Sequence, residues 1–66
     1  MSIILNGEEK ELEAAASVAQ LLEELGFDKQ PVLVEHNGQA LHPREFSGTT
    51  LAEGDHIEVI RIVAGG

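Results

Sequence analysis

The chain has 66 residues, of which 42% are hydrophobic, and its 12 acidic residues against 4 Lys and Arg give a formal net charge of −8. This length fits one small domain and leaves little room for an active-site cleft with its supporting shell. The negative charge disfavours nucleic acids and anionic membranes as partners, because both are bound through clustered Lys and Arg.

A β-hairpin is predicted at the start of the chain. Residues 3–5 are β-favouring, and they are followed by Asn6-Gly7, a dipeptide that tolerates the positive φ angles of a tight hairpin turn. The return strand is expected from about Glu9 to Glu13, with Leu12 facing inward. Its charged residues suit the edge of a sheet, where pairing with other chains must be discouraged.

A short helix is predicted after this hairpin. Ser17 and Gln20 have the spacing of a capping box, in which each side chain satisfies a free backbone N–H group at the start of a helix. Gly26 stands where a left-handed residue commonly ends a helix. One apolar stripe with helical spacing runs between them: Val18, Leu21, Leu22 and Leu25.

A second hairpin and a last strand are predicted in the C-terminal half. Residues 32–36 form the first strand, Asn37-Gly38 the turn and residues 39–41 a brief return strand, before a tight helical turn at residues 42–46. Residues 56–63 form the longest strand. Its alternation places Ile57 and Val59 on one face and the following residues on the other: Glu58, Ile60 and Ile62.

These elements predict an α+β fold of one domain, residues 1–66. Two hairpins around one helix bury the apolar stripe only if the sheet wraps over the helix and the last strand lies centrally in it. This is the β-grasp arrangement, a mixed sheet of four to five strands clasping one short helix. Residues 63–66 are expected to be a flexible tail, as for most unrestrained termini.

The body of the predicted domain lacks a convincing catalytic set. The three histidines lack the spacing of a helical metal site and are interpreted as surface residues. Ser17 is explained as a helix cap, and the glycines are scattered over predicted turns without forming a phosphate loop. The chain contains no cysteine, which excludes disulfides and fits a reducing compartment. With no visible signal peptide or membrane-spanning stretch, a cytoplasmic location is expected.

Two features remain as candidate sites. The first is the outward row of Glu58, Ile60 and Ile62, which Leu33 would join from a neighbouring strand. It is a binding surface, a set of apolar residues covered by a loop, or a set of ordinary scattered apolar residues. The second is the Gly65-Gly66 end. A C-terminal carboxylate is ionised at neutral pH and is able to attack the α-phosphate of a nucleotide, and residues without a Cβ fit a narrow channel.

Several short motifs resemble those of a known family. They are the two Asn-Gly turns, Pro-Arg-Glu at residues 43–45, Gly-Asp at residues 54–55 and the ending Val-Ala-Gly-Gly. Together with the predicted fold, they make the whole chain resemble the ThiS family of ubiquitin-like β-grasp sulfur carriers, which act in thiamine biosynthesis.

The resemblance implies a carrier and not an enzyme. A ThiF-like adenylating enzyme, using ATP and Mg²⁺, would activate the carboxylate of Gly66. Sulfur supplied through a cysteine desulfurase would convert this adenylate to a thiocarboxylate, and a ThiG-like thiazole synthase would take up the sulfur. The carrier itself would bind no cofactor or metal.

The resemblance also implies roles for the residues near the tail. Val63, Ala64 and Gly65 would thread into the partner enzyme, and the docking surface would comprise Leu33, Glu58, Ile60 and Ile62. Two alternatives remain open at this stage. One is a MoaD-like carrier that supplies sulfur for molybdopterin or another metabolite, and the other is an acidic β-grasp interaction module that does not react.

Overall fold

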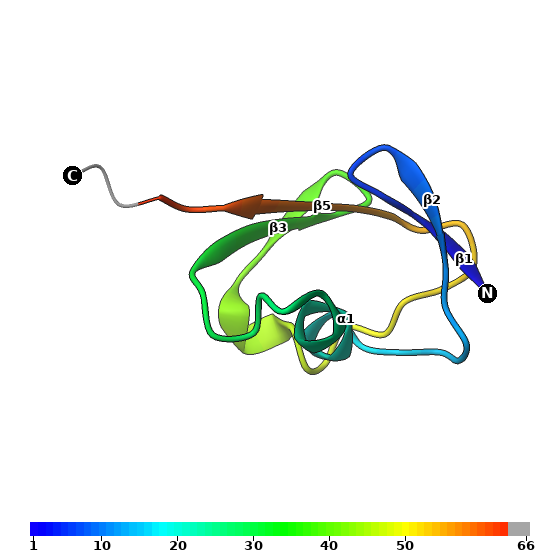
Figure 1. The fold of residues 1–66 in the computed structure, drawn as a ribbon, viewed down its shortest axis with the longest axis horizontal. Coiled ribbons are helices and arrows are strands. Elements are labelled where there is room, and N and C mark those ends of the chain that lie inside the picture. Colours follow the sequence, from blue (N-terminus) through cyan, green and yellow to red (C-terminus); the bar gives the residue numbers. More distant parts are fainter. Residues whose placement is uncertain (64–66) are drawn as a thin grey trace.

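The computed structural model describes residues 1–63, which fold into a mixed five-stranded sheet lying over one α-helix (Figure 1). The strand order is β2-β1-β5-β3-β4, and β1 and β5 are parallel while the other neighbours are antiparallel. The elements in chain order are β1 (Ser2–Leu5), β2 (Glu8–Glu11), α1 (Val18–Leu25), β3 (Val32–His36), β4 (Gln39–Leu41), a 3₁₀ turn η1 (Pro43–Glu45) and β5 (His56–Arg61).

This arrangement confirms the predicted α+β, ubiquitin-like β-grasp fold and the central position of the last strand. Two predicted strand ends were wrong. β2 ends at Glu11 and not at Glu13, because its partner β1 begins at Ser2, which lies opposite Glu11. β5 ends at Arg61 and not at residue 63, because its partner β3 begins at Val32, opposite Arg61.

The two Asn-Gly turns form as predicted. Asn6 and Asn37 adopt φ angles of 49° and 50°, and each is followed by a glycine with a φ of 83°. Asparagine and glycine occupy this left-handed region at less cost than other residues. Each dipeptide therefore closes a two-residue hairpin loop between paired strands.

Helix α1 begins after Ser17 and ends at Gly26, as predicted. The side chain of Ser17 accepts a hydrogen bond from the Gln20 N–H at 3.1 Å, and the Gln20 side chain accepts one from the Ser17 N–H at 2.9 Å. Gly26 ends the helix with a φ of 82°. Between these ends, the helix turns its apolar stripe toward the sheet.

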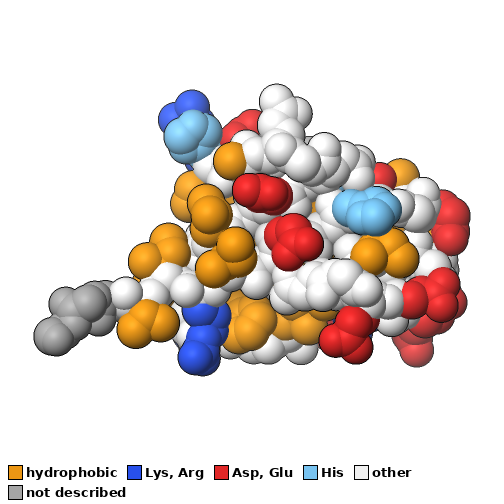
Figure 2. Space-filling model, turned by 90° about the horizontal axis from the view of Figure 1, so that it is seen from above, with side chains coloured by type: hydrophobic (Ala, Val, Ile, Leu, Met, Phe, Trp, Pro, Cys, Tyr) orange, Lys and Arg blue, Asp and Glu red, His pale blue; other side chains and the backbone are white. Residues whose placement is uncertain are grey.

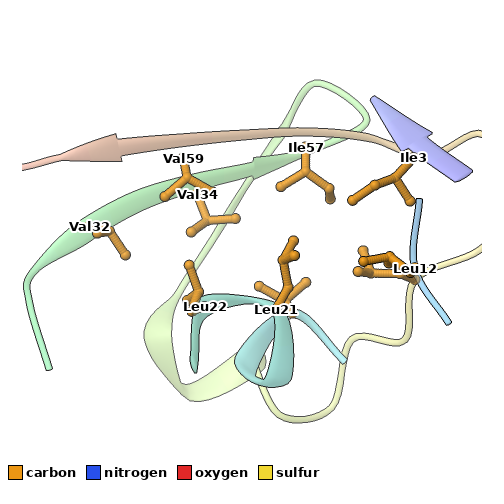
Figure 3. Close-up of a cluster of buried hydrophobic side chains, with 10 residues drawn as sticks. Ile3, Leu12, Leu21, Leu22, Val32, Val34, Ile57 and Val59 are labelled. Carbon is orange, nitrogen blue, oxygen red and sulfur yellow. The ribbon is translucent and has the colours of Figure 1, made fainter. Parts of the chain in front are cut away.

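The hydrophobic core lies between α1 and the inner face of the sheet (Figure 3). Leu21 and Leu22 point up from the helix toward strand residues that point down. Full burial of a side chain of this size contributes about 1.5–3 kcal/mol, so this small set supplies much of the stability. The buried hydrophobic residues are Ile3, Leu12, Val18, Leu21, Leu22, Val32, Val34, Leu51, Ile57 and Val59.

The two turn asparagines also attach the hairpins to β5. The Asn6 backbone N–H donates to the Ile57 C=O, and its side-chain Oδ1 accepts from the Val59 N–H, both at 2.8 Å. Asn37 makes the same kind of pair with His56, through its backbone N–H and its Oδ1, again at 2.8 Å each. β5 is thus held on both sides by a side chain from a hairpin turn.

Asp55 connects the loop before β5 to the second hairpin. Its Oδ2 lies 2.8 Å from Nε2 of His36 and accepts from the Ala52 N–H at 2.9 Å, while its Oδ1 accepts from Nδ2 of Asn37 at 3.2 Å. Partial burial opposes ionisation of this carboxyl. The hydrogen bonds from His36, Ala52 and Asn37 outweigh burial and lower the pKa of Asp55 below its ordinary value of 3.8.

We expect Asn6→Ala to lower the free energy of unfolding by about 2–3 kcal/mol. About 1 kcal/mol comes from the lost hydrogen bond to the Val59 N–H, and the rest from placing alanine at a positive φ, where it lacks the polar side chain that lets asparagine adopt the left-handed region. Urea denaturation followed by circular dichroism measures the change. The control Asn6→Gly removes the hydrogen bond but accepts the positive φ, so it should lose only about 1 kcal/mol. Equal losses in the two variants would contradict this division.

We expect Asp55→Asn to change how stability depends on pH. Because the folded-state pKa of Asp55 is lowered, its ionised form stabilises the fold above the ordinary value of 3.8, and this contribution is lost as the pH falls through the lower, folded-state pKa. The difference in unfolding free energy between wild type and Asp55→Asn should therefore be largest near neutral pH and shrink below pH 3.8. Urea titrations across this range measure it, and a constant difference would contradict the assignment.

Candidate docking face and C-terminal segment

The outward face of β3 and β5 carries exposed apolar side chains near the end of β5. Leu33 lies directly opposite Ile60 in the sheet register, and these residues are 41% and 51% exposed. Ile62 follows Ile60 at the same alternation and is 54% exposed, and Val63 comes next along the chain with an exposure of 77%. Figure 2 shows the apolar side chains gathered where β5 leaves the body of the domain. We call Leu33, Ile60, Ile62 and Val63 the apolar patch.

The position of this patch follows from strand alternation. Val34 and Val59 are opposite one another and are buried against α1, so their neighbours Leu33 and Ile60 must face outward. The exposures show that no loop among residues 1–63 covers them. The alternative that a loop shields this row is therefore wrong, and Leu33 lies on the same outward face as Ile60. The binding role of this row stays a prediction.

Two carboxylates adjoin the patch on the same face. Glu35 and Glu58 lie directly opposite one another in the next outward-facing pair of the register, and neither forms an ion pair within residues 1–63. Like charges placed opposite one another in a sheet are destabilising. The face therefore combines an exposed apolar end with a negative centre.

The remaining predicted tail lies mostly outside the described residues. Ile62 still donates its N–H to the Pro31 C=O at 3.0 Å, and Val63 follows beyond the strand. The predicted reactive and threading residues Ala64, Gly65 and Gly66 are not among the described residues. The structure thus places Val63 directly after Ile62, at the end where the chain continues.

The rest of the described structure shows little that resembles a catalytic centre. Within residues 1–63, no group of three or more His, Cys, Asp or Glu side chains is placed to hold a metal ion. A surface hollow of about 550 Å³ is lined by residues 11–16 with Gln20 and Glu24, which are carboxylate, amide and alanine side chains for the most part. No described helix has the length and apolarity to cross a membrane.

The sheet, the single helix and the patch beside the end of the last strand define the class as a ubiquitin-like β-grasp domain. The model of the ThiS family matches residues 3–66. The chain therefore belongs to the ThiS family, and the resemblance noted in the sequence is confirmed. Over its whole length it is also similar to the crystal structure of the thiamine biosynthesis protein ThiS from Geobacter metallireducens, with 30% identity, a TM-score of 0.85 and full coverage of both chains.

The chain is also similar to two curated proteins that are thiazole synthases. The chain is 33% identical to a thiazole synthase of Paramagnetospirillum magneticum and 38% identical to a thiazole synthase of Magnetococcus marinus, in each case over 66 residues. All of this chain is covered in both comparisons, but it spans only 20% of the length of each relative.

Sequence reasoning missed one feature of this site. β5 is longer than β1, and their pairing stops at Leu5 and Ile57, so one edge of β5 near the patch has no neighbouring strand. The early position of Asn6-Gly7 was the available signal, because it limits the first strand to a few residues.

We expect Ile60→Thr to change the unfolding free energy by no more than about 0.5 kcal/mol, because Ile60 is half exposed and threonine keeps the β-branched shape. The matched variant Val59→Thr places a hydroxyl at a buried position and should cost about 1–3 kcal/mol. Urea denaturation compares the two. Weaker retention of Ile60→Thr on a phenyl column would show that the exposed side chain contributes surface hydrophobicity, and a large loss of stability would show instead that it belongs to the core.

Proposed function

We propose that this protein is a sulfur carrier of thiamine biosynthesis, whose C-terminal glycine, Gly66, is adenylated and then converted to a thiocarboxylate. The observation that carries the proposal is the ThiS family match, which extends over residues 3–66 and so includes both terminal glycines. The structural similarity to a thiamine biosynthesis protein over the full chain supports it. This chemistry consumes ATP, which suits the cytoplasm.

The proposed reaction uses the carrier as a substrate of other enzymes. The Gly66 carboxylate attacks the α-phosphorus of ATP in a ThiF-like enzyme, with release of pyrophosphate. A cysteine desulfurase supplies the sulfur as a persulfide, and a thiol reductant releases it as hydrosulfide. The hydrosulfide then displaces AMP from the adenylate, and the product is the thiocarboxylate. The adenylating enzyme supplies the ATP and Mg²⁺ sites, so the carrier needs neither a cofactor nor a catalytic group of its own.

The apolar patch and its carboxylates suit the docking step of this cycle. Leu33, Ile60 and Ile62 offer exposed apolar area, whose removal from water contributes about 25 cal/mol per Å². Glu58 lies on the same face and would favour a basic partner surface. Docking there would leave Val63, Ala64 and Gly65 to lead Gly66 into the active site of the partner.

Thiazole synthase is the proposed acceptor of the sulfur. Two relatives that carry a region similar to this chain are thiazole synthases, and this chain spans one part in five of each. In these relatives, a region similar to this chain and a thiazole synthase belong to one polypeptide, which suggests that the carrier acts in thiazole formation. The same observation favours thiazole formation over the molybdopterin alternative and over an interaction module that does not react.

We expect incubation with a ThiF-like enzyme, MgATP and a sulfur donor to raise the mass of the protein by one sulfur minus one oxygen. Intact-protein mass spectrometry detects this change. Deletion of Gly66 and addition of one alanine after Gly66 should both abolish the shift, because each displaces the reacting carboxylate from its position relative to the docked domain.

Two further measurements separate the possible outcomes. Circular dichroism should show that both tail variants keep the wild-type fold, since the buried core of residues 1–63 contains no residue beyond Val59. A mass shift that survives either change would contradict the assignment to Gly66. A wild-type shift that transfers sulfur to a molybdopterin-synthase large subunit but not to thiazole synthase would favour the molybdopterin alternative.

A further inference from the structure

β5 has a partner strand along its whole length on one side only. On the β3 side, pairing runs from Ile57 to Arg61 and is extended by the hydrogen bond from the Ile62 N–H to the Pro31 C=O. On the β1 side, pairing stops at Ile57, because β1 turns away at Asn6-Gly7. The final residues of β5 therefore lie at the edge of the sheet, although the strand begins at its centre.

The hydrogen-bond pattern fixes which groups face this open side. The Ile57 C=O and the Val59 N–H both bond to Asn6, so the odd-numbered residues of β5 point their backbone groups toward β1. The next groups in this direction are the Val59 C=O and the Arg61 N–H and C=O. No hydrogen bond of these three groups is found within residues 1–63. We call them the open edge.

The other two edges of the sheet are protected in ways that the open edge is not. β2 carries three glutamates and one lysine in four residues, and β4 has only three residues. Charged and very short edge strands discourage pairing with other chains. The open edge is flanked instead by Ile60 and Ile62 of the apolar patch, with Arg61 as its charged residue.

The chemistry of the open edge defines what would bind there. Its order is acceptor, donor, acceptor at the spacing of a strand, and the complement of that order is an extended polypeptide backbone. Such a ladder would also fix the direction of the residues that follow Arg61, because successive hydrogen bonds determine the register of a strand. A partner that receives the tail would position it more precisely if it fixed the strand register at Arg61.

We propose that an extended segment of thiazole synthase adds as a strand along the open edge of β5 and so sets how far the tail reaches into that enzyme. The inference rests on the proposed function. Thiazole synthase is selected as the occupant because two relatives combine a region similar to this chain with that enzyme in one polypeptide. The ladder adjoins the apolar patch, so one docked partner would cover both.

The test compares Arg61→Pro with Arg61→Ala in binding to thiazole synthase, measured by isothermal titration calorimetry. Both variants lose the arginine side chain, but only proline also removes the N–H of the open edge. Proline is tolerated in a strand where its missing N–H faces no partner, and residue 61 meets that condition. Arg61→Pro should bind about tenfold more weakly than Arg61→Ala, the loss expected for one backbone hydrogen bond. Equal affinities would overturn the inference.

A second measurement uses the wild-type protein and does not depend on how proline is tolerated. Amide hydrogen exchange followed by NMR should show fast exchange of the Arg61 N–H in the free carrier and slow exchange in the complex with thiazole synthase. The Ile62 N–H, which is already bonded to Pro31, serves as the internal control and should be slower than Arg61 in the free protein. Fast exchange of Arg61 in the complex, or no complex with wild type, would overturn the inference.

The outcomes separate this inference from the proposed function. If wild type acquires the thiocarboxylate but Arg61 stays unprotected in the complex, the strand addition is wrong and the sulfur-carrier function stands. If Gly66 never acquires sulfur, the proposed function is wrong whatever Arg61 does. The alternative occupant of the open edge is a second copy of this chain, and analytical sedimentation of wild type and Arg61→Pro tests it. A dimer that forms only in wild type would assign the open edge to that second copy and overturn the choice of thiazole synthase.

Discussion

The structure depends on the last strand of the chain lying in the middle of the sheet. β5 is bonded to β3 on one side and to β1 on the other, and its Ile57 and Val59 pack against the helix. A central strand that ends the described domain requires the chain to leave the sheet at one end, past Arg61. The alternation that buries Ile57 and Val59 also turns Ile60 outward at that exit. The buried core, the outward-facing Ile60 and the point where the chain leaves the sheet therefore all follow from the central position of β5.

The short β1 has a second consequence for the same strand. Asn6 ends the pairing with β1, and its side chain takes over one backbone bond of β5 at the Val59 N–H. A longer β1 would have formed hydrogen bonds with the backbone N–H and C=O of Arg61. It would then also have covered the edge of β5 near the point where the chain leaves the sheet. The asparagine thus stabilises β5 up to Val59 and leaves the following residues accessible. Asn6 therefore determines both the first hairpin turn and how far β5 is paired on its β1 side.

Much of the fold was predictable from the sequence because its signals are local. Asn-Gly dipeptides fix the hairpins, and Ser17, Gln20 and Gly26 fix the helix through bonds that reach at most four residues. Strand ends were predicted less well, because they depend on where the partner strand begins. The Asp55 network and the open edge were not predicted at all, since each joins residues separated by many positions in the chain. The outward row on β5 was predicted, because alternation is also local, but its exposure needed the structure.

The charges on the outward face of β3 and β5 bear on how tightly a partner would bind there under the proposed function. Glu35 and Glu58 face one another without a cation partner within residues 1–63, beside an apolar patch that four side chains form. Charge on an interface mainly affects association rate and choice of partner, while apolar area and packing determine most of the affinity. Under the proposed function, the protein visits an adenylating enzyme and then a sulfur acceptor, and it must leave each of them. A small patch with a carboxylate centre suits rapid, selective and reversible docking better than a wide apolar surface would, because a wide apolar surface would hold the carrier on its first partner.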